Sequence, residues 1–261
     1  MELVSYLNAS IIFFGYIIQN TFVQYLFYVH RKRDVATWKT QPEKGGDRLG
    51  VLWGLPIFSS KPGRVPWHVA LTTFNLLLAT FFAFAVTEAC VRGHSQMVFT
   101  SAGDYGVGWI LRDLLVAYVY ENVAEFYWHR LLHWAPLYKT FHKVHHTYHS
   151  PEPFDDMMIH PFESFAYYVI LYAPPFLFRC HVLAFLGYMV VMGLAGTLDH
   201  SGVRVYIPGI YDTADHDKHH ERFNVNFGFP HCFLDILHGT YDGTFLGRTY
   251  RPSGASSAPR R

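Results

Sequence analysis

Charged residues are scarce in this chain, and their scarcity excludes several classes of protein. Asp, Glu, Lys and Arg make up 16% of the 261 residues, against about 25% in a typical soluble domain. Aromatic residues reach 18%, so the chain is not of the disordered class, which has few aromatic residues and much charge. The formal net charge is +1, which excludes a nucleic-acid binder that works through bulk electrostatics.

Cysteine is also rare, and no common cofactor motif is present. Cys90, Cys180 and Cys232 are odd in number and far apart, which excludes a disulfide framework and a Cys-x-x-Cys zinc site. The glycine-rich run at residues 103–108 lacks the Gly-x-Gly-x-x-Gly spacing of a dinucleotide site. No haem-binding His-Pro-Gly-Gly sequence and no internal repeat occur.

Long apolar runs are the most extensive feature that the chain does have. Residues 3–29 and 69–91 each supply the roughly 20 mostly apolar residues that a membrane span needs. Residues 109–128 are amphipathic, and their acidic side chains would point into a helix bundle if this run met lipid. The first run lacks a basic start and a small-residue cleavage site, which favours a retained span over a signal peptide.

A fourth apolar region, residues 165–198, is interrupted near its middle. Pro174-Pro175 and the polar Arg179-Cys180-His181 break it into two short halves, and proline in a helix removes a hydrogen bond. We therefore expect two linked helices that enter the membrane and return. The sequence predicts an all-α integral membrane protein with about four transmembrane helices, two plus a hairpin. A buried helix hairpin in a soluble protein is the alternative.

The distribution of basic residues predicts the orientation. Loop 92–108 carries only Arg92, whereas loop 30–67 carries eight basic residues: Arg31, Lys32, Arg33, Lys39, Lys44, Arg48, Lys61 and Arg64. The positive-inside rule places loop 30–67 in the cytosol. Counting spans from there puts residues 129–160 and 200–261 on that same side.

Histidine is in excess and is clustered. The chain has 17 histidines, and three short motifs, WHRLLH, FHKVHH and DHDKHH, hold eight of them at spacings of three or four residues. Such spacings put the rings on one helix face. Neutral imidazole binds iron, zinc, copper and nickel. Metal binding also removes the repulsion and desolvation that packed free histidines would suffer.

Eight histidines are too many for a single ion. Tetrahedral zinc takes four ligands, so eight would close two structural zinc sites, whereas redox iron keeps positions open. His200 and His160 raise the number of candidates to ten. The count favours a dinuclear site without choosing the metal. A metal transporter is disfavoured, because it would place its polar ligands inside the membrane.

The motifs also occur in a familiar order. HRLLH, HKVHH followed by Pro151, IHPFE, DHSG, DHDKHH and then NFG together resemble the fatty acid hydroxylase and sterol desaturase superfamily, over about residues 110–240. The resemblance implies a four-helix membrane anchor, a cytosolic histidine-rich helical cap, two iron ions and residence in the endoplasmic reticulum membrane. It also implies oxygen-dependent hydroxylation, oxidation or desaturation of a lipid.

The resemblance assigns roles to particular residues and no catalytic residue beyond the metal ligands. The implied ligands are His129, His133, His142, His145, His146, His200, His216, His219 and His220, with His160 as a ligand or a pocket residue. Arg204 stands where some branches have a further histidine. Metal-bound histidines usually donate their other N–H to a carboxylate or carbonyl. We expect that role for Glu125, Asp199, Asp215 and Asp217, with Asp155, Asp156 and Glu163 as further candidates.

IHPFE and the histidine missing at Arg204 favour a sterol substrate, with C-methyl oxidation or hydroxylation as the expected reaction. The alternatives are a sterol C5-type desaturase, a fatty-acyl or sphingoid-base hydroxylase, and, from another class, a non-catalytic zinc-binding scaffold. The expected partners are a membrane lipid, the bilayer and a cytochrome b5 or reductase-type donor that passes electrons from NAD(P)H. Zinc could replace iron on isolation, and no nucleic acid is expected.

The expected organisation has three parts. Residues 1–108 hold the N-terminal spans and the basic loop, residues 109–245 form the catalytic region, and residues 246–261 form a disordered tail. The tail is rich in Ser, Pro, Gly and Ala, a composition that lacks the apolar residues of a packed segment.

Overall fold

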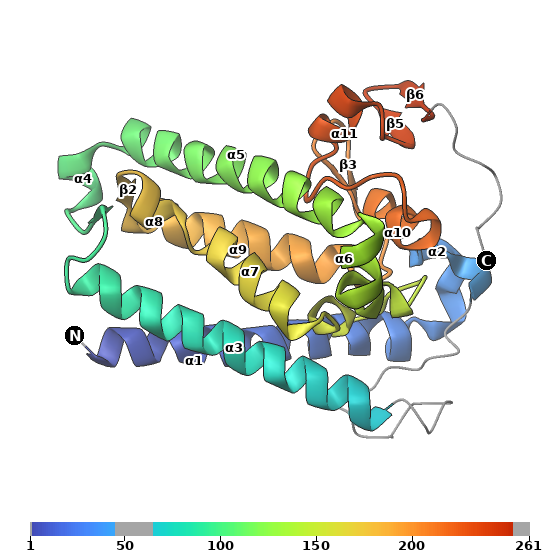
Figure 1. Cartoon of the computed structure of the whole chain (residues 1–261), viewed down its shortest axis with the longest axis horizontal. Helices are drawn as coiled ribbons and strands as arrows, with labels where there is room; N and C mark the ends of the chain where they lie inside the picture. The colour runs from blue at the N-terminus through green and yellow to red at the C-terminus, as the bar shows by residue number, and fades with distance from the viewer. Residues whose placement is uncertain (1, 45–64, 253–261) are drawn as a thin grey trace.

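Four long helices run lengthwise through the protein in the computed structural model, which describes residues 2–44 and 65–252 (Figure 1). They are α1 (Glu2–Val23), α3 (Val65–Val91), α5 (Val107–Leu132) and α9 (Val182–Asp199). A π-helical segment, η1 (Gln24–His30), extends α1. The apolar residues of α1, α3 and α9 surround each helix rather than forming one stripe, a pattern typical of membrane helices.

Short elements join these helices and form the two ends of the molecule. The short helices are η2 (Lys32–Asp34), α2 (Val35–Trp38), η3 (Pro42–Lys44), α4 (Ala102–Tyr105), α6 (Ala135–Thr140), η4 (His142–Thr147), η5 (Asp155–Met157), α7 (Pro161–Leu171), α8 (Pro174–Leu177), α10 (Thr213–Arg222) and α11 (Phe233–His238). Three two-stranded sheets pair β1 (Met97–Val98) with β2 (Cys180–His181) in parallel, and β3 (Tyr206–Ile207) with β4 (Tyr211–Asp212) and β5 (Gly243–Phe245) with β6 (Arg248–Tyr250) in antiparallel fashion.

Three of the described helical segments are long and apolar enough to cross a membrane: Leu3–His30, Trp67–Val91 and Val182–Asp199. The predicted hairpin is present, but its arms are unequal. Pro161 begins α7 and the break at Pro174 follows it, so α7 has only 11 residues. At 1.5 Å per residue it is roughly 16 Å long, about half of a bilayer core. The prediction of about four transmembrane helices, two plus a hairpin, is therefore not confirmed, because only one arm of the hairpin is among the three described segments long enough to cross.

The outer surface of the helices is apolar, while several polar side chains are buried between them. Ile11, Phe14 and Ile18 of α1 are each more than half exposed, which suits a lipid environment. Inside, Ser5 Oγ donates to Glu88 Oε2 at 2.7 Å and joins α1 to α3. Polar groups facing inward and paired with one another are expected in a membrane bundle.

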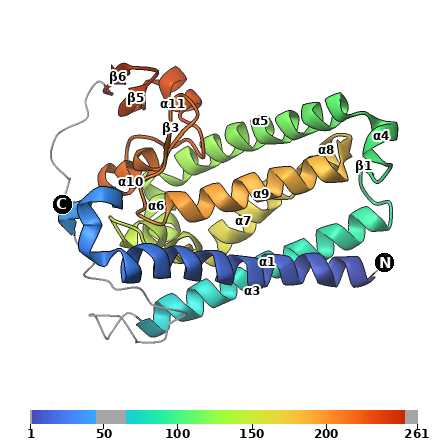
Figure 2. The ribbon, with the colours of Figure 1, turned by 180° about the vertical axis from the view of Figure 1, so that it is seen from behind.

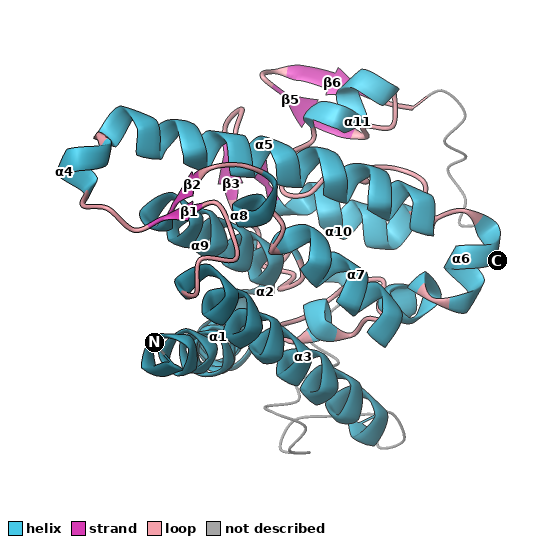
Figure 3. Cartoon of the chain, turned by 60° about the vertical axis from the view of Figure 1, so that its left-hand side comes forward, coloured by secondary structure: helices cyan, strands magenta, loops and turns pink. Residues whose placement is uncertain are grey.

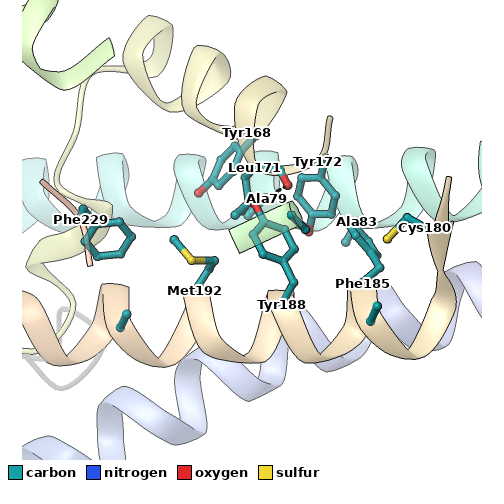
Figure 4. Close-up of a cluster of buried hydrophobic side chains, with 13 residues drawn as sticks. Ala79, Ala83, Tyr168, Leu171, Tyr172, Cys180, Phe185, Tyr188, Met192 and Phe229 are labelled. Carbon is teal, nitrogen blue, oxygen red and sulfur yellow. Dashed lines mark hydrogen bonds between the residues drawn. The ribbon is translucent and has the colours of Figure 1, made fainter. Parts of the chain in front are cut away.

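The apolar core lies between α9, α7 and α3. Tyr188 and Met192 of α9 point toward Tyr168 and Leu171 of α7 (Figure 4). The Tyr188 hydroxyl donates to Glu121 Oε2 at 2.9 Å and contacts the carbonyl oxygen of Leu171 at 3.0 Å. This one buried side chain therefore ties together α5, α7 and α9, which form the walls of the site described below.

All the histidine-rich segments lie at one end of the bundle. The C-terminal ends of α5 and α9, together with η4 and α10, meet there, while the N-terminus and β2 lie at the other end (Figures 1 and 2). Residues 129–160 and 200–222 therefore share one end, as the charge distribution predicts. The described part of the basic loop also packs there, because Thr40 N–H donates to Gly202 O at 3.0 Å.

Two sequence predictions change in detail. Lys39, counted among the eight basic residues of loop 30–67, is buried and bonds to the Tyr28 hydroxyl at 3.2 Å. Arg48, Lys61 and Arg64 of that loop lie outside the described residues. The disordered tail predicted from residue 246 is wrong at its start, because Arg248–Tyr250 pairs with β5 beside α11 (Figure 3). Residues 253–261 of that tail lie outside the described residues.

Candidate metal centre

Nine histidines meet where the helices end, and they form two groups. His129, His133, His142, His146 and His219 make the first group, and His145, His200, His216 and His220 make the second. Within each group one ring nitrogen per residue lies within 4.8 Å of all the others. These nine are the predicted ligands other than His160, and the structure brings them together from α5, η4, α9 and α10.

Two of the three histidine motifs contribute to both groups, whereas WHRLLH supplies His129 and His133 to the first group alone. From η4, His142 and His146 enter the first group and His145 the second. From α10, His219 enters the first group, while His216 and His220 enter the second. The Asp212 side chain caps α10 by accepting from Ala214 N–H at 3.0 Å, which fixes where this helix starts and so which way its histidines face.

The spacing between ring nitrogens fits metal coordination. His146 Nε2 lies 3.3 Å from that of His133, 3.2 Å from that of His142 and 3.1 Å from that of His219. In the second group the His200–His145, His216–His200 and His220–His216 Nε2 pairs lie 3.2, 2.9 and 3.2 Å apart. With metal–nitrogen bonds of about 2.1 Å, neighbouring ligand nitrogens lie roughly 3.0–3.4 Å apart in octahedral or tetrahedral sites.

Burial keeps five of these rings neutral, which is the form that binds metals. Desolvation comes first and neighbouring imidazoles second in holding the pKa values of His145, His146, His216 and His219 well below the ordinary value. Burial also lowers the pKa of His200 to about 4. These five rings therefore present a lone pair at neutral pH.

Most of the second ring nitrogens are held by the protein. The Nδ1 atoms of His129, His200, His219 and His220 lie 2.8, 2.9, 2.7 and 3.1 Å from the carbonyl oxygens of Phe227, Gly196, Val225 and Tyr148. His142 Nδ1 lies 2.6 Å from Glu163 Oε1. Such partners fix the tautomer and leave Nε2 free to bind a metal. His129 Nε2 is buried with no hydrogen-bond partner in the described structure. Coordination to a metal ion would satisfy its lone pair.

The structure places His160 away from both groups. Its Nδ1 accepts from Phe162 N–H at 3.2 Å and caps α7, and its ring packs on that of Phe141. His160 therefore starts the helix that carries Glu163. The His-Pro pair fits this use, because proline is favoured in the first helical turn.

The four carboxylates expected to support the ligands do not hydrogen-bond to histidine. Asp199 accepts from the Tyr211 hydroxyl at 2.6 Å, Asp215 from the Tyr241 hydroxyl at 2.9 Å, and Asp217 from Gln41 Nε2 at 2.6 Å. Glu125 Oε2 is buried without a hydrogen bond. Proximity in sequence fails for the three aspartates because side chains from other segments occupy them, whereas Glu125 lines the cavity beside His129 without bonding to it. Glu163, three residues after His160 in the IHPFE motif, takes the supporting role at His142.

A mostly apolar cavity of about 570 Å³ opens onto both histidine groups. Its inner end includes His129 and His142 of the first group and His145, His200 and His216 of the second. Its walls come from α1, α5, α7 and α9. From His200 to Leu186, another lining residue, α9 runs for roughly 21 Å, so the cavity is long enough for an extended apolar molecule.

Comparisons with known proteins agree with the motifs. Residues 114–240 match the fatty acid hydroxylase family. The chain is 29% identical to lathosterol oxidase of Rattus norvegicus over 183 residues, which cover 68% of this chain and 57% of that protein. It is 30% identical to a probable Delta(7)-sterol 5(6)-desaturase of Neurospora crassa over 191 residues, which cover 71% of this chain and 55% of that protein.

The chain thus spans little more than half the length of these curated relatives. No solved structure matches it. All nine clustered histidines lie within the matched residues 114–240. Through this region, the chain belongs to the fatty acid hydroxylase and sterol desaturase superfamily.

Proposed function

We propose that this protein is an oxygen-dependent lipid oxidase that holds two iron ions and acts on a membrane sterol. One observation supports the proposal above all: the apolar cavity ends on rings from both histidine groups. A lipid lying in that cavity would have one of its carbon atoms beside both metal positions. The cavity volume falls within the range of about 300–1,000 Å³ that is usual for small-molecule sites.

The chain's own residues would bind the two ions, orient the lipid and exclude water from the site. Neutral imidazoles of the two groups would hold the ions, and Glu163 would keep the His142 ring in position. Bound iron would supply the activation of molecular oxygen for attack on an unreactive C–H bond. Apolar wall residues such as Leu132, Met192 and Phe229 would exclude water and hold the lipid beside the histidines.

The relatives bear on the type of reaction. The motifs favour C-methyl oxidation or hydroxylation, with C5-type desaturation as the alternative. The relatives described above are named for lathosterol oxidation and for sterol 5(6)-desaturation, and these names favour the alternative. Both reactions remove hydrogen from a sterol carbon, so the same cavity and metal pair would serve either.

We further propose that a separate cytochrome b5 or reductase-type donor supplies electrons from NAD(P)H. The chain carries no dinucleotide or haem motif of its own. Lys32 and Arg33 are exposed, and helix α2, which follows them directly, lies at the end of the molecule that holds the histidines (Figure 1), which suits an acidic donor. The same basic residues support a cytosolic orientation, and the endoplasmic reticulum membrane is what the family resemblance implies.

Lipid mass spectrometry on cells that express the chain under ¹⁸O₂ tests the proposal. The comparison is a His145→Ala, His146→Ala double variant, and His94→Ala, an exposed histidine at the other end, is the matched control. A sterol that gains one labelled oxygen only with intact histidines would establish hydroxylation, and one that loses two hydrogens without label would establish desaturation. No lipid change, with donor and reductase present and the protein folded, would contradict the enzyme and favour the zinc scaffold.

A further inference from the structure

The wall of the apolar cavity contains a hydrogen-bonded polar pair that the metal centre does not use. Tyr16 projects from α1 and Asp156 from η5, and both line the cavity. The Tyr16 hydroxyl donates to Asp156 Oδ1 at 2.5 Å. A carboxyl group is costly to keep in apolar surroundings unless it has a partner. Its position therefore suggests that it has a task inside the cavity.

The Asp156 carboxyl has capacity for one more partner. Tyr16 is the one side chain that hydrogen-bonds to it within the described parts of the chain, and the residue is only partly buried. The backbone N–H groups of Met157 and of Asp156 itself also act on this carboxyl. Because a carboxylate has about four acceptor positions, it can still accept a hydrogen bond from a molecule in the cavity. The Tyr16 oxygen also keeps acceptor capacity, so the pair suits a hydroxyl group.

Two helices hold this pair in place. Asn75 Nδ2 of α3 donates to Met157 O at 2.9 Å and to Ile159 O at 2.8 Å, and Phe154 N–H donates to Asn20 Oδ1 of α1 at 3.1 Å. The backbone on both sides of Asp156 is thus anchored. A binding group that is held before its ligand arrives loses little entropy on binding.

The pair lies at a useful distance from the metal centre. Asn20 is one helical turn beyond Tyr16, and its Nδ2 contacts Thr197 Oγ1 at 3.4 Å. Thr197 lies in turn three residues before His200. At 1.5 Å per residue, the pair is on the order of 10 Å along the cavity from the second histidine group. A group bound by the pair would therefore belong to the same molecule that reaches the histidines.

Two other polar side chains in this wall already have hydrogen-bond partners. Asn8 Nδ2 donates to Thr87 Oγ1 at 2.8 Å, and Gln19 Nε2 donates to Gly193 O at 3.5 Å. The competing candidates are Glu125 and Trp128, because Glu125 Oε2 and Trp128 Nε1 are buried without a hydrogen bond in the described structure. Both line the metal end of the cavity, Glu125 one turn before His129 and Trp128 directly before it.

We propose that Tyr16 and Asp156 bind the hydroxyl group of the lipid substrate and so select alcohols over ethers and hydrocarbons. This inference rests on the proposed function for the class of lipid that is bound. It adds the functional group by which that lipid is recognised. The Asp156 carboxylate accepts a hydrogen bond from the lipid hydroxyl, and Tyr16 holds the carboxylate in the orientation that this bond requires. The hydroxyl then fixes which carbon of the lipid lies beside the histidines.

Equilibrium binding to the purified full chain in detergent tests this site without any turnover. The probes are radiolabelled lathosterol and its 3-O-methyl ether, at pH 8. Burial raises the pKa of Asp156 to about 7, so at pH 8 the carboxylate accepts hydrogen bonds but does not donate them. We expect the wild-type protein to bind the alcohol about tenfold or more tightly than the ether, since hydrogen bonds to charged groups are the stronger kind.

Two variants separate the pair from its surroundings. Asp156→Asn presents an amide N–H that an ether oxygen accepts, so the preference for the alcohol should collapse toward one. Tyr16→Phe removes the hydroxyl that orients the Asp156 carboxylate and should reduce the preference for the alcohol severalfold. Tyr25→Phe and Asp34→Asn make the same chemical changes at exposed positions near the N-terminus and should keep the wild-type preference.

Equal wild-type binding of alcohol and ether would overturn the site, as would a preference that survives both cavity variants or disappears only in Glu125→Gln. If neither sterol binds, octadecan-1-ol and its methyl ether replace them. Tighter binding of octadecan-1-ol than of its methyl ether would support the hydroxyl-binding site and contradict a sterol substrate. Failure to bind any of the four probes would overturn the site. Preferential binding of lathosterol without turnover would leave the site standing and count against the proposed oxidation.

Discussion

The Nε2 atoms of His200 and His216 lie 2.9 Å apart, although His200 directly follows α9 and His216 belongs to α10. The two residues belong to the second histidine group, and neither contributes to the first. Helix α10 is therefore packed against the C-terminal end of α9 through the histidine groups themselves. This separation of the two groups makes them testable one at a time.

Replacing His200 with alanine should empty the second position and leave the first. We expect bound metal to fall from two ions to about one per chain. The second position would keep only His145, His216 and His220 as ligands, while the first would keep all five of its histidines. Elemental analysis of the purified protein measures this. His94→Ala, at the opposite end, is the control, and loss of both ions or of none would contradict the assignment of two separate groups.

Glu163→Gln should weaken metal binding without unfolding the protein. The 2.6 Å contact between Glu163 Oε1 and His142 Nδ1 orients that ring. Glutamine keeps an acceptor oxygen but removes the charge that strengthens this bond, so the loss of metal affinity should lie at the lower end of the 10–100-fold that loss of such a partner typically costs. Competition with a chelator measures the change. Glu221→Gln removes an exposed carboxylate that pairs with Lys44 instead, and it should leave affinity unchanged. Equal affinity in both variants would remove Glu163 from the site.

Gly202→Ala should destabilise the packing of residue 202 against Tyr28 and Pro151. Gly202 has φ +66°, and a Cβ atom there would lie 2.6 Å from Tyr28 Oη and 2.7 Å from Pro151 O. We expect a loss of about 2–4 kcal/mol from backbone strain and overpacking together. Thermal unfolding in detergent measures it. Gly108→Ala, where a Cβ meets nothing within 4 Å, is the control and should not lower the unfolding temperature.

The preference for a hydroxylated lipid should depend on pH. With the pKa of Asp156 raised to about 7, the carboxylate form dominates at pH 8 and the neutral form at pH 6. The neutral carboxyl can donate to an ether oxygen, so the preference for lathosterol over its methyl ether should decrease as the pH falls. Asp155, Tyr16 and the backbone of Met157 also act on this carboxyl. A preference that is constant from pH 6 to pH 8 would contradict this origin.

Much of the architecture could be predicted because it depends on short-range patterns. Runs of apolar residues predict the long helices, and Pro174-Pro175 predicts the break before α9. The spacing of the histidines, read with the order of the motifs, predicted the nine residues that the structure brings together. Their role as ligands stays a prediction that metal analysis must test. Each of these features needs only neighbours within about one or two helical turns.

Other features depend on partners that are distant in the sequence, and here local patterns failed. Glu125, Asp199, Asp215 and Asp217 are near histidines in sequence but bond elsewhere or not at all. Glu163 reaches His142 across 21 residues. His160 belongs to a helix cap, and α7 is too short to be an equal arm of the hairpin.

Which segments are apolar and which histidines share a helix face can be derived from the sequence alone, because these properties follow from composition and from a period of 3.6 residues. How the FHKVHH and DHDKHH motifs divide between the two histidine groups, and where the cavity runs, follows only from the packing of the helices. This packing also places Tyr16 beside Asp156, 140 residues away in the sequence. Those outcomes depend on how separate helices pack against one another, and that packing is decided by contacts between segments far apart in the chain.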